Sequence, residues 1–413
     1  MSVSKMKSIS MLLPWLAFAS LIAILPIAFL YEKGGRYLFY YCAYFSLTGL
    51  ALEVFKKRAI HFTERKSLAM LMLGLVFIGW SLYAKYMHGE QGELYFTAGK
   101  RCLLAFLIMT YIFHVYREKY INQSLVIRYC ILSLALAFVT ASSFAFLQTF
   151  TSADRVVLGI NRATLTAYAY SAVTLALIAF ILYSKENKFK KLYFLAVSII
   201  SLYVIMLTQT RSAMVIHTLF LAYMTFRLFA VTRNVKFISF VAMLMLVAAG
   251  LSYKVIETRF DTTVQEYRDY EHGNDRTSLG SRFTMWKTGI LSFEKAPFGQ
   301  TQVERNNFIT TYLDAHNQKD SWALIYINVH LHNEFIQYAS LFGVLGIGVL
   351  LYFFYIFIIA EFRAARRLTP LAAAGIATLL YGMTDVVLTS IEFIAIFSIL
   401  VVLLSLIEKR SEP

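Results

Sequence analysis

Long apolar blocks alternate with short charged connections along the chain. Each block runs for roughly 17–25 residues, the length that an α-helix needs to cross the hydrocarbon of a bilayer. The blocks are continuous, whereas the strands of a membrane barrel would alternate apolar and polar residues. We therefore predict an all-α integral membrane protein with about twelve transmembrane helices. The predicted helices cover residues 10–31, 37–55, 67–84, 102–116, 125–147, 166–183, 192–209, 213–231, 237–256, 335–359, 370–388 and 391–407.

The basic residues of the connections give an orientation, because cytoplasmic connections carry an excess of Lys and Arg. Lys and Arg gather on alternate connections and at both ends of the chain. They are Lys5, Lys7, Lys56, Lys57, Arg58, Arg65, Lys66, Lys185, Lys188, Lys190, Lys191, Arg363, Arg366, Arg367, Lys409 and Arg410. We expect both termini on the cytoplasmic side, which agrees with an even number of helices. The first apolar block resembles a signal peptide, but its long core and the lack of a cleavage site predict a retained helix.

One outward-facing connection is far longer than the others. It covers residues 257–334, and a link of this length is unusual unless it has a function. The chain therefore divides into transmembrane helices one to nine in residues 1–256, this large loop, and helices ten to twelve with a cytoplasmic tail in residues 335–413.

Two short helices are predicted within the loop. Val264–Tyr270 would extend the preceding transmembrane helix. Ser281–Phe293 has apolar residues at helical spacing, Ser278 or Ser281 as its N-cap, and Pro297 shortly after its end. The large loop is thus expected to have a structure of its own.

The amino-acid composition narrows the possible classes of protein further. Hydrophobic residues make up 59% of the 413 residues and charged residues only 15%, against about a quarter charged in soluble domains. The net charge of +15 lies mostly in the short connections, which favours membrane orientation over nucleic-acid binding. The three cysteines lie within or beside apolar blocks, so neither a disulfide framework nor a cysteine metal site is expected.

Arg211 interrupts an apolar stretch at a tight outward-facing turn and begins a helix. An arginine at a membrane boundary is costly unless it snorkels or pairs, and the positive end of a helix disfavours a cation. An anion bound there would use both the guanidinium and the free amides. Arg211 is therefore either an anion-binding residue or a snorkelling anchor.

Arg282 has a similar setting, in the first turn of the helix predicted in the loop. Together with the hydroxyl of Ser281 and the backbone amides, its guanidinium would suit a phosphate. The alternative is an ordinary solvated arginine.

A polar segment, His330-Leu331-His332-Asn333-Glu334, comes directly before the tenth predicted helix. Asn333 fits the N-cap, and Glu334 fits the first turn. Histidines two residues apart share a face only in an extended segment, and a zinc site would need further ligands that the spacing of the other histidines does not provide. A general base is better supported, with Glu334 or Asn333 orienting the imidazole. A buried or capping histidine remains the alternative.

Other polar residues are weaker candidates. Arg101 and Arg162 are expected on the outer face, where they could add to a site for an anionic lipid or substrate. Asp385 and Glu392 flank the last outward turn and could be structural or gate a cavity. His217 is expected to be a satisfied group between helices.

The arrangement resembles the O-antigen ligases of Gram-negative bacteria. The matching segments are Thr208-Gln209-Thr210-Arg211, Ser278-Leu279-Gly280-Ser281-Arg282, Pro297-Phe298-Gly299, Val329-His330-Leu331-His332-Asn333-Glu334 and Phe342-Gly343-Val344-Leu345-Gly346. Each is short, but their order relative to one long loop is specific.

The resemblance implies a GT-C-like fold in the bacterial inner membrane and a metal-independent, inverting glycosyltransferase without a cofactor. Its donor would be O-antigen on undecaprenyl diphosphate, and its acceptor a sugar hydroxyl of lipid A–core on the periplasmic side. By this resemblance Arg211 and Arg282 would bind the diphosphate and His332 would be the general base. His330 and Asn333 would be further substrate-binding candidates, and Glu334 an orienting group. The chemistry is consistent, since arginines can stabilise a leaving diphosphate where no carboxylate cluster holds Mg²⁺.

Two other functions stay open. An O-antigen polymerase would use the same donor with a second lipid-linked glycan as acceptor, although the His-Leu-His-Asn-Glu segment favours the ligase. A twelve-helix transporter would be expected to show two similar halves, and the sequence has no convincing half-repeat.

Overall fold

The computed structural model describes residues 3–56, 60, 62, 64–89, 92–151, 155–184, 188–233, 253–408 and positions 235, 239, 243, 246, 247 and 250. Within these residues every regular element is a helix, so the predicted all-α class is confirmed. The helices of the first half are α1 Val3–Leu30, α2 Glu32–Phe55, α3 Arg65–His88, α4 Glu93–Arg117, α5 Gln123–Thr151, η1 Leu158–Ile160, α6 Ala163–Tyr183, α7 Lys190–Thr208 and α8 Arg211–Thr232. Those of the second half are α10 Tyr253–Glu271, α11 Ser278–Lys295, α12 Gln302–Ala315, α13 Ala323–Tyr326, α14 Glu334–Phe354, η2 Tyr355–Ala360, α15 Glu361–Ala365, α16 Pro370–Gly382 and α17 Ile391–Glu408.

Ten helices in the described part of the chain are long and apolar enough to span a membrane, and α16 is a shorter apolar helix. They correspond to eleven of the twelve predicted helices. The ninth predicted helix, 237–256, lies mostly outside the described residues. The tenth is longer than expected, since α14 continues through the π-helical turn η2 into α15.

Two of the predicted boundaries that differ from the structure bear on the site. The fourth helix begins at Glu93 rather than at residue 102, so Arg101 lies inside α4 and not in an outer connection. A charged residue can lie within a membrane helix where it faces protein rather than lipid. The eleventh helix ends at Gly382, and residues 383–390 form an irregular segment that carries Asp385.

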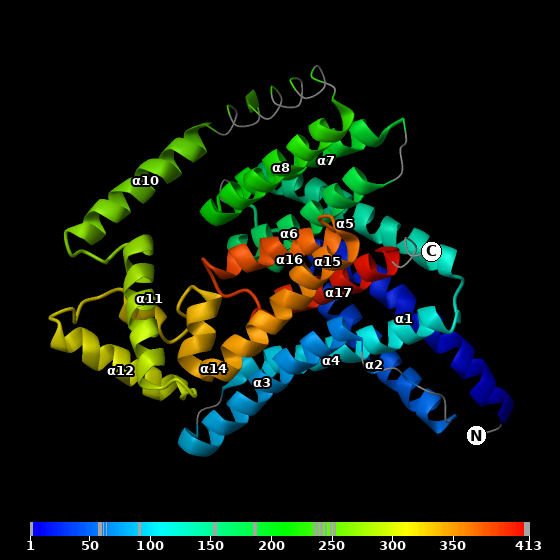
Figure 1. Cartoon of the computed structure of the whole chain (residues 1–413), viewed down its shortest axis with the longest axis horizontal. Helices are drawn as coiled ribbons and strands as arrows, with labels where there is room; N and C mark the ends of the chain where they lie inside the picture. Colours follow the sequence, from blue (N-terminus) through cyan, green and yellow to red (C-terminus); the bar gives the residue numbers. More distant parts are fainter. Residues whose placement is uncertain are drawn as a thin grey trace.

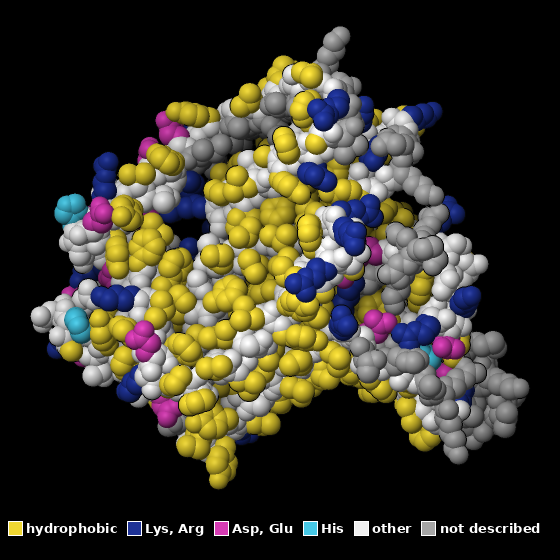
Figure 2. All heavy atoms as spheres, viewed as in Figure 1, with side chains coloured by type: hydrophobic (Ala, Val, Ile, Leu, Met, Phe, Trp, Pro, Cys, Tyr) yellow, Lys and Arg dark blue, Asp and Glu magenta, His cyan; other side chains and the backbone are white. Residues whose placement is uncertain are grey.

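The long helices form one bundle, with α10, α11 and α12 gathered beside one end of it (Figure 1). Helices α6 and α17 are the most enclosed of the membrane-spanning helices. Figure 2 shows apolar side chains over the middle of this face and charged side chains over the region of α10–α12. This distribution suits a bundle surrounded by lipid and a loop domain in contact with water.

The large loop has a small core of its own, as expected. Its buried members are Met285, Ile309, Leu313, Ala323, Ile327 and Leu331. The predicted loop helix is longer than expected at both ends, and its N-cap is Thr277 rather than Ser278 or Ser281. The Thr277 side chain accepts a hydrogen bond from the Gly280 amide. Thr277 has the extended backbone that an N-cap needs, whereas Ser278 already lies in the helix.

The loop is joined to α14 at a break in that helix. Gly343 has φ +64° and ψ −152°, a conformation that is open almost only to glycine. The Val344 amide donates to the Pro297 carbonyl (2.9 Å), and the Gln300 amide donates to the Leu341 carbonyl (2.9 Å). A Cβ on Gly343 would clash with the carbonyl of Pro297. The motifs Pro297-Phe298-Gly299 and Phe342-Gly343-Val344-Leu345-Gly346 therefore form a single backbone joint.

Candidate functional site

The two histidines of the His-Leu-His segment lie side by side. Leu331 is fully buried in the loop core, so its neighbours His330 and His332 are turned away from that core. Their ring centroids are 4.2 Å apart. His332 adopts a left-handed backbone conformation (φ +51°), and its carbonyl accepts a hydrogen bond from the indole of Trp286. The segment is thus fixed in one conformation by its apolar residue and its backbone.

Asp385, from the irregular segment after α16, is the partner of both histidines. Its Oδ1 lies 3.1 Å from His332 Nδ1 and 3.9 Å from His330 Nε2. The same oxygen accepts a hydrogen bond from the Val386 amide. Burial by itself would raise the pKa of Asp385, but the hydrogen bond from His332 and the two imidazoles hold it below its usual value. Asp385 is therefore a carboxylate at neutral pH.

The ionised Asp385 decides the tautomer of His332. A carboxylate can only accept a hydrogen bond, so Nδ1 of His332 carries the proton. Nε2 is then the basic nitrogen, and it has no hydrogen-bond partner within the described residues. Burial, His332 and nearby arginines lower the pKa of His330 to about 4, although Asp385 opposes the shift. His330 is consequently neutral, and His332 is the histidine placed to accept a proton.

Asn333 and Glu334 hold this segment in place. Asn333 caps α14 as expected by accepting from the Ile336 amide, and its side-chain amide donates to the Met383 carbonyl. Glu334 is fully buried, and its Oε2 accepts from the amides of Val387 (2.8 Å) and Leu388 (3.1 Å). The hydrogen bonds of the described residues include none between Glu334 and His332. The carboxylate that contacts His332 is therefore that of Asp385, and Glu334 instead fixes the segment that carries Asp385.

A second buried network supports the histidines from the loop side. Arg305 is fully buried, and its guanidinium donates to the Gln337 side-chain oxygen (3.1 Å) and to the Ile327 carbonyl (2.6 Å). The same Gln337 oxygen accepts from the Leu331 amide (2.9 Å), and the Gln337 amide group donates to the hydroxyl of Tyr95. Helices α4, α12 and α14 thereby fix the residue between the two histidines.

Arg282 lies beside this cluster in the second turn of α11, because the helix begins at Ser278 and not at Ser281 as predicted. It is half-buried, and within the described residues it has no hydrogen bond or ion pair. Its charge acts on His330 and on the hydroxyl of Tyr168. A half-buried guanidinium without a partner is costly, and an anion would relieve that cost.

Arg211 begins α8 as predicted, but its charge is already paired. Its guanidinium contacts both carboxylate oxygens of Glu266 on α10 (2.9 and 3.1 Å), and it also donates to Thr263. Glu266 Oε2 accepts a further hydrogen bond from the Leu279 amide (3.0 Å) in the first turn of α11. The chain itself thus supplies an anion to the guanidinium of Arg211, but the amide that this anion contacts belongs to α11 and not to α8, whose free amides were expected to bind it.

The turn around Arg211, residues 208–212, is linked to the histidine cluster through aromatic rings. Ser212 is hydrogen-bonded to the hydroxyl of Tyr168 (2.9 Å). The ring of Tyr168 stacks on that of Tyr381 with centroids 4.4 Å apart, and Tyr381 lies four residues before Asp385. On the other side of the turn, Arg155 donates to the Thr208 carbonyl (2.8 Å). Three connections far apart in sequence therefore meet at one end of the bundle: the one that carries Arg155, the turn before α8 and the segment after α16.

Arg101 and Arg162 are not part of this cluster. Arg101 is buried in α4, lies over the ring of Tyr40, and donates a hydrogen bond to the Ile391 carbonyl. Arg162 is an exposed residue directly before α6. The contacts described for these two arginines include none with His332, Asp385 or Arg282. His217 is buried between two serine hydroxyls, Ser171 and Ser201, as a satisfied group between helices.

The same three side chains could hold a metal ion. Ligand atoms of His330, His332 and Asp385 all lie within 4.8 Å of one another, and two imidazoles with a carboxylate form a set that zinc accepts. The third ligand comes from residue 385, which the spacing of histidines could not indicate. Chemically, the cluster suits either a metal or an imidazole base oriented by a carboxylate.

Two comparisons with known proteins bear on this arrangement. Residues 196–353 match the family described as O-antigen ligase. Over 281 residues the chain is 30% identical to the O-antigen ligase of Escherichia coli K12. This alignment covers 67% of the chain and 66% of the relative, so the chain spans about two thirds of the relative's length.

The fold and the site define a multi-helix membrane protein with a histidine–carboxylate centre and arginines at one end of its bundle. The chain belongs to the O-antigen ligase family. Membership supports a role in O-antigen and lipopolysaccharide assembly. The family match contains Arg211, Arg282, His330 and His332 but ends before Asp385.

Proposed function

We propose that the protein transfers O-antigen polysaccharide from undecaprenyl diphosphate to a sugar hydroxyl of lipid A–core, as an inverting and metal-independent glycosyltransferase. The observation that carries this proposal is the hydrogen bond between His332 Nδ1 and the buried carboxylate of Asp385. It leaves Nε2 as a base in a cluster whose other histidine, His330, interacts with Arg282, and the described residues provide no ion pair for Arg282. A base and an anion-binding group are what a hydroxyl nucleophile and a diphosphate leaving group require.

In the proposed step the acceptor oxygen attacks the anomeric carbon, on the face opposite the phosphate oxygen. The new carbon–oxygen bond forms as the bond to the diphosphate breaks. His332 Nε2 takes the hydroxyl proton, and Asp385 stabilises the resulting imidazolium as the triad carboxylate does in serine hydrolases. The proton is later released to solvent, and undecaprenyl diphosphate leaves with the bonding electrons.

Arg282 is proposed to meet the negative charge that develops on the diphosphate. Its half-buried guanidinium has no ion pair within the described residues, so its whole charge is available to a ligand. Arg211 is proposed to bind the same diphosphate after its pair with Glu266 opens. The carboxylate of Glu266 already contacts the groups that a phosphate would use, the guanidinium and the Leu279 amide.

The site is proposed to face the periplasm of a bacterial inner membrane. The basic connections support this orientation, since Lys66, Lys190 and Arg367 gather at the end of the bundle away from the histidines. No nucleotide donor is available outside the cytoplasm, so the energy for transfer would come from the lipid diphosphate.

The test is transfer by the purified protein, in detergent, from a lipid-linked O-antigen to lipid A–core. His332→Ala should abolish transfer while donor binding persists. His316→Ala is a matched control, because His316 is an exposed loop histidine that stacks on Tyr312. Near-normal transfer by His332→Ala would refute the role of His332 as the general base.

Two further outcomes would change the assignment. Elongation of a lipid-linked glycan without transfer to lipid A–core would indicate a polymerase. Activity that is lost on chelation and restored by a divalent ion would show metal dependence, for which His330, His332 and Asp385 are the candidate ligands.

A further inference from the structure

A cleft of about 1020 Å³ opens between α5, α6 and α7 at the end of the bundle away from the histidines. Most of its lining is apolar and comes from membrane-spanning helices, including Ile131, Val139, Phe180 and Val197. The proposed glycosyl transfer makes no use of this cleft. An apolar cleft among membrane-spanning helices is bordered by lipid, so hydrocarbon is its natural occupant.

The mouth of the cleft is polar and basic. Lys190 and Arg367 line it, together with Tyr183 at the end of α6. Arg367 lies over the ring of Tyr183, 5.1 Å from its centroid, and no ion pair of Arg367 is found among the described residues. Glu408 also lines the cleft, and its carboxyl group interacts with Glu361 and Lys66, which line a neighbouring cavity. Lys190 donates a hydrogen bond to the Ser184 carbonyl (2.9 Å), and Arg367 brings a positive charge to the mouth.

Tyr183 has a hydroxyl at this mouth that lacks a hydrogen-bond partner among the described residues. The hydroxyl is also shielded from solvent. A buried hydroxyl without a partner costs free energy and calls for an explanation, such as an unseen ligand. An acceptor oxygen placed here would satisfy the hydroxyl and would also meet the charge of Arg367.

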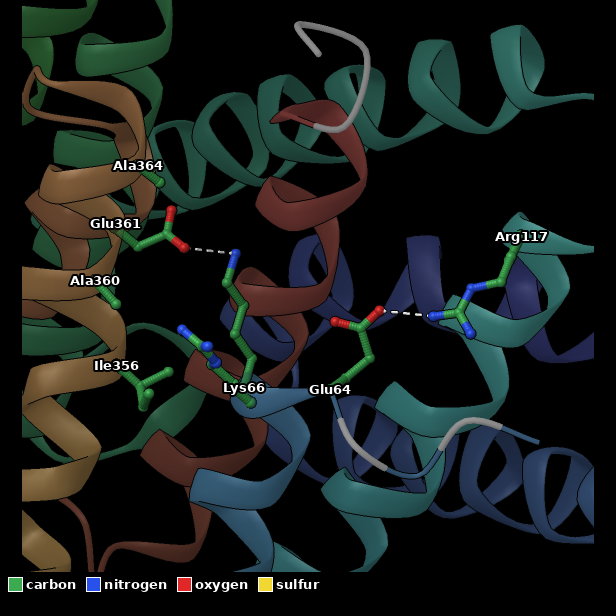
Figure 3. A pocket seen from close by; sticks show the side chains of 8 residues that line it. Glu64, Lys66, Arg117, Ile356, Ala360, Glu361 and Ala364 are labelled. Atoms are coloured by element: carbon green, nitrogen blue, oxygen red, sulfur yellow. Dashed lines mark hydrogen bonds and ion pairs between the residues drawn. The ribbon is translucent and has the colours of Figure 1, made fainter.

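A second cavity at the same end of the bundle provides a contrast. Its volume is about 390 Å³, and charged residues of both signs line it. Figure 3 shows that these charges pair with each other: Lys66 with Glu361 (2.8 Å) and Arg117 with Glu64 (2.9 Å). The charges of this cavity neutralise each other, whereas the cleft beside Tyr183 combines an apolar interior with Arg367, for which the described residues provide no ion pair.

We propose that the cleft between α5, α6 and α7 binds an anionic phospholipid of the leaflet at this end of the bundle. Its acyl chains lie against Ile131, Val139 and Val197, and its phosphate accepts from Tyr183, Lys190 and Arg367. Basic pockets between membrane helices on the cytoplasmic side have the chemistry that recognises such head groups. The site is independent of the proposed glycosyl transfer.

The test compares phosphatidylglycerol with phosphatidylcholine, each titrated into the purified full chain in a neutral detergent. Bound lipid is counted by native mass spectrometry, and the unfolding temperature is followed in parallel. Phosphatidylglycerol should bind more tightly and raise the unfolding temperature more. Arg367→Gln should weaken its binding about fivefold, the effect expected of one basic residue near a lipid surface.

Two more variants separate this site from general attraction to a basic surface. Ala135→Trp would fill the apolar part of the cleft and should displace the lipid, since Ala135 lines it. Arg363→Gln is the matched control, because Arg363 is an exposed residue of α15 that does not line the cleft. Equal binding of the two lipids, or equal losses from Arg363→Gln and Arg367→Gln, would overturn the proposal. Should Ala135→Trp fail to fold, the comparison of the two arginine variants decides alone.

Discussion

The contact between Asp385 and His332 makes the sharpest test of the proposed chemistry. Asp385→Asn keeps the size of the side chain but removes the charge that stabilises an imidazolium. An amide can also donate to Nδ1, which would favour the tautomer with the proton on Nε2. That tautomer cannot take a proton from the acceptor hydroxyl, so we expect a large loss of kcat.

Two energies set the range of the loss of transfer rate expected for Asp385→Asn. A positioned general base contributes roughly 10²–10⁴-fold, equal to about 3–5.5 kcal/mol of barrier. Two unit charges about 4 Å apart interact by roughly 4 kcal/mol at the effective dielectric of a protein boundary. The observed 3.1 Å contact is consistent with a value in this range. Asp385→Asn should therefore lower transfer by about 10²–10⁴-fold.

The assay is single-turnover transfer from saturating lipid-linked donor, with donor binding measured separately. His332→Ala and the double variant, which combines it with Asp385→Asn, complete a double-mutant cycle. Because the two residues act as a unit, the double variant should be no slower than His332→Ala. A loss under threefold in Asp385→Asn, or additive losses in the double variant, would refute the mechanism.

Three more predictions follow from contacts in the same region. Glu266→Gln should release Arg211 and lower KM for the donor, by up to about fivefold for a partly exposed ion pair, with kcat little changed. The control is Asp261→Asn, on the exposed surface of α10. A raised KM in Glu266→Gln would mean that Glu266 positions Arg211 instead. Gly343→Ala should destabilise the protein by roughly 2–5 kcal/mol, through its backbone conformation and its clash with Pro297, and thermal unfolding in detergent measures this loss. Because the pKa of His330 is lowered to about 4, the unfolded chain binds more protons between pH 4 and 6.5, and stability should rise with pH across this window. His330→Gln should remove up to about 3 kcal/mol of that pH dependence, and an unchanged slope would show that His330 does not titrate in this way.

The sequence predicted the elements of the fold because hydropathy determines which segments enter a bilayer. It also predicted the Asn333 cap and the helix that begins at Arg211, since both depend on local sequence. It did not predict the start of α4, because a buried arginine within a membrane helix looks like the edge of a connection.

The contacts that complete the site could not be predicted from local pattern. Asp385 lies 53 residues from His332, and Glu266 lies 55 residues from Arg211. Each pair is set by how two helix ends pack, and hydropathy gives no register for that packing. Asp385 was noted at an outward turn, but its partner was not.

The joint between Gly343 and Pro297 has a consequence for biosynthesis. A ribosome makes residues 297–300 before α14, and in the proposed orientation these residues must cross the membrane first. The break in α14 can then close only against residues 297–300 that have already been exported. Export of the loop therefore precedes final insertion of α14. A chain in which residues 297–300 are misplaced would hold α14 in an incomplete state that quality-control proteases can recognise.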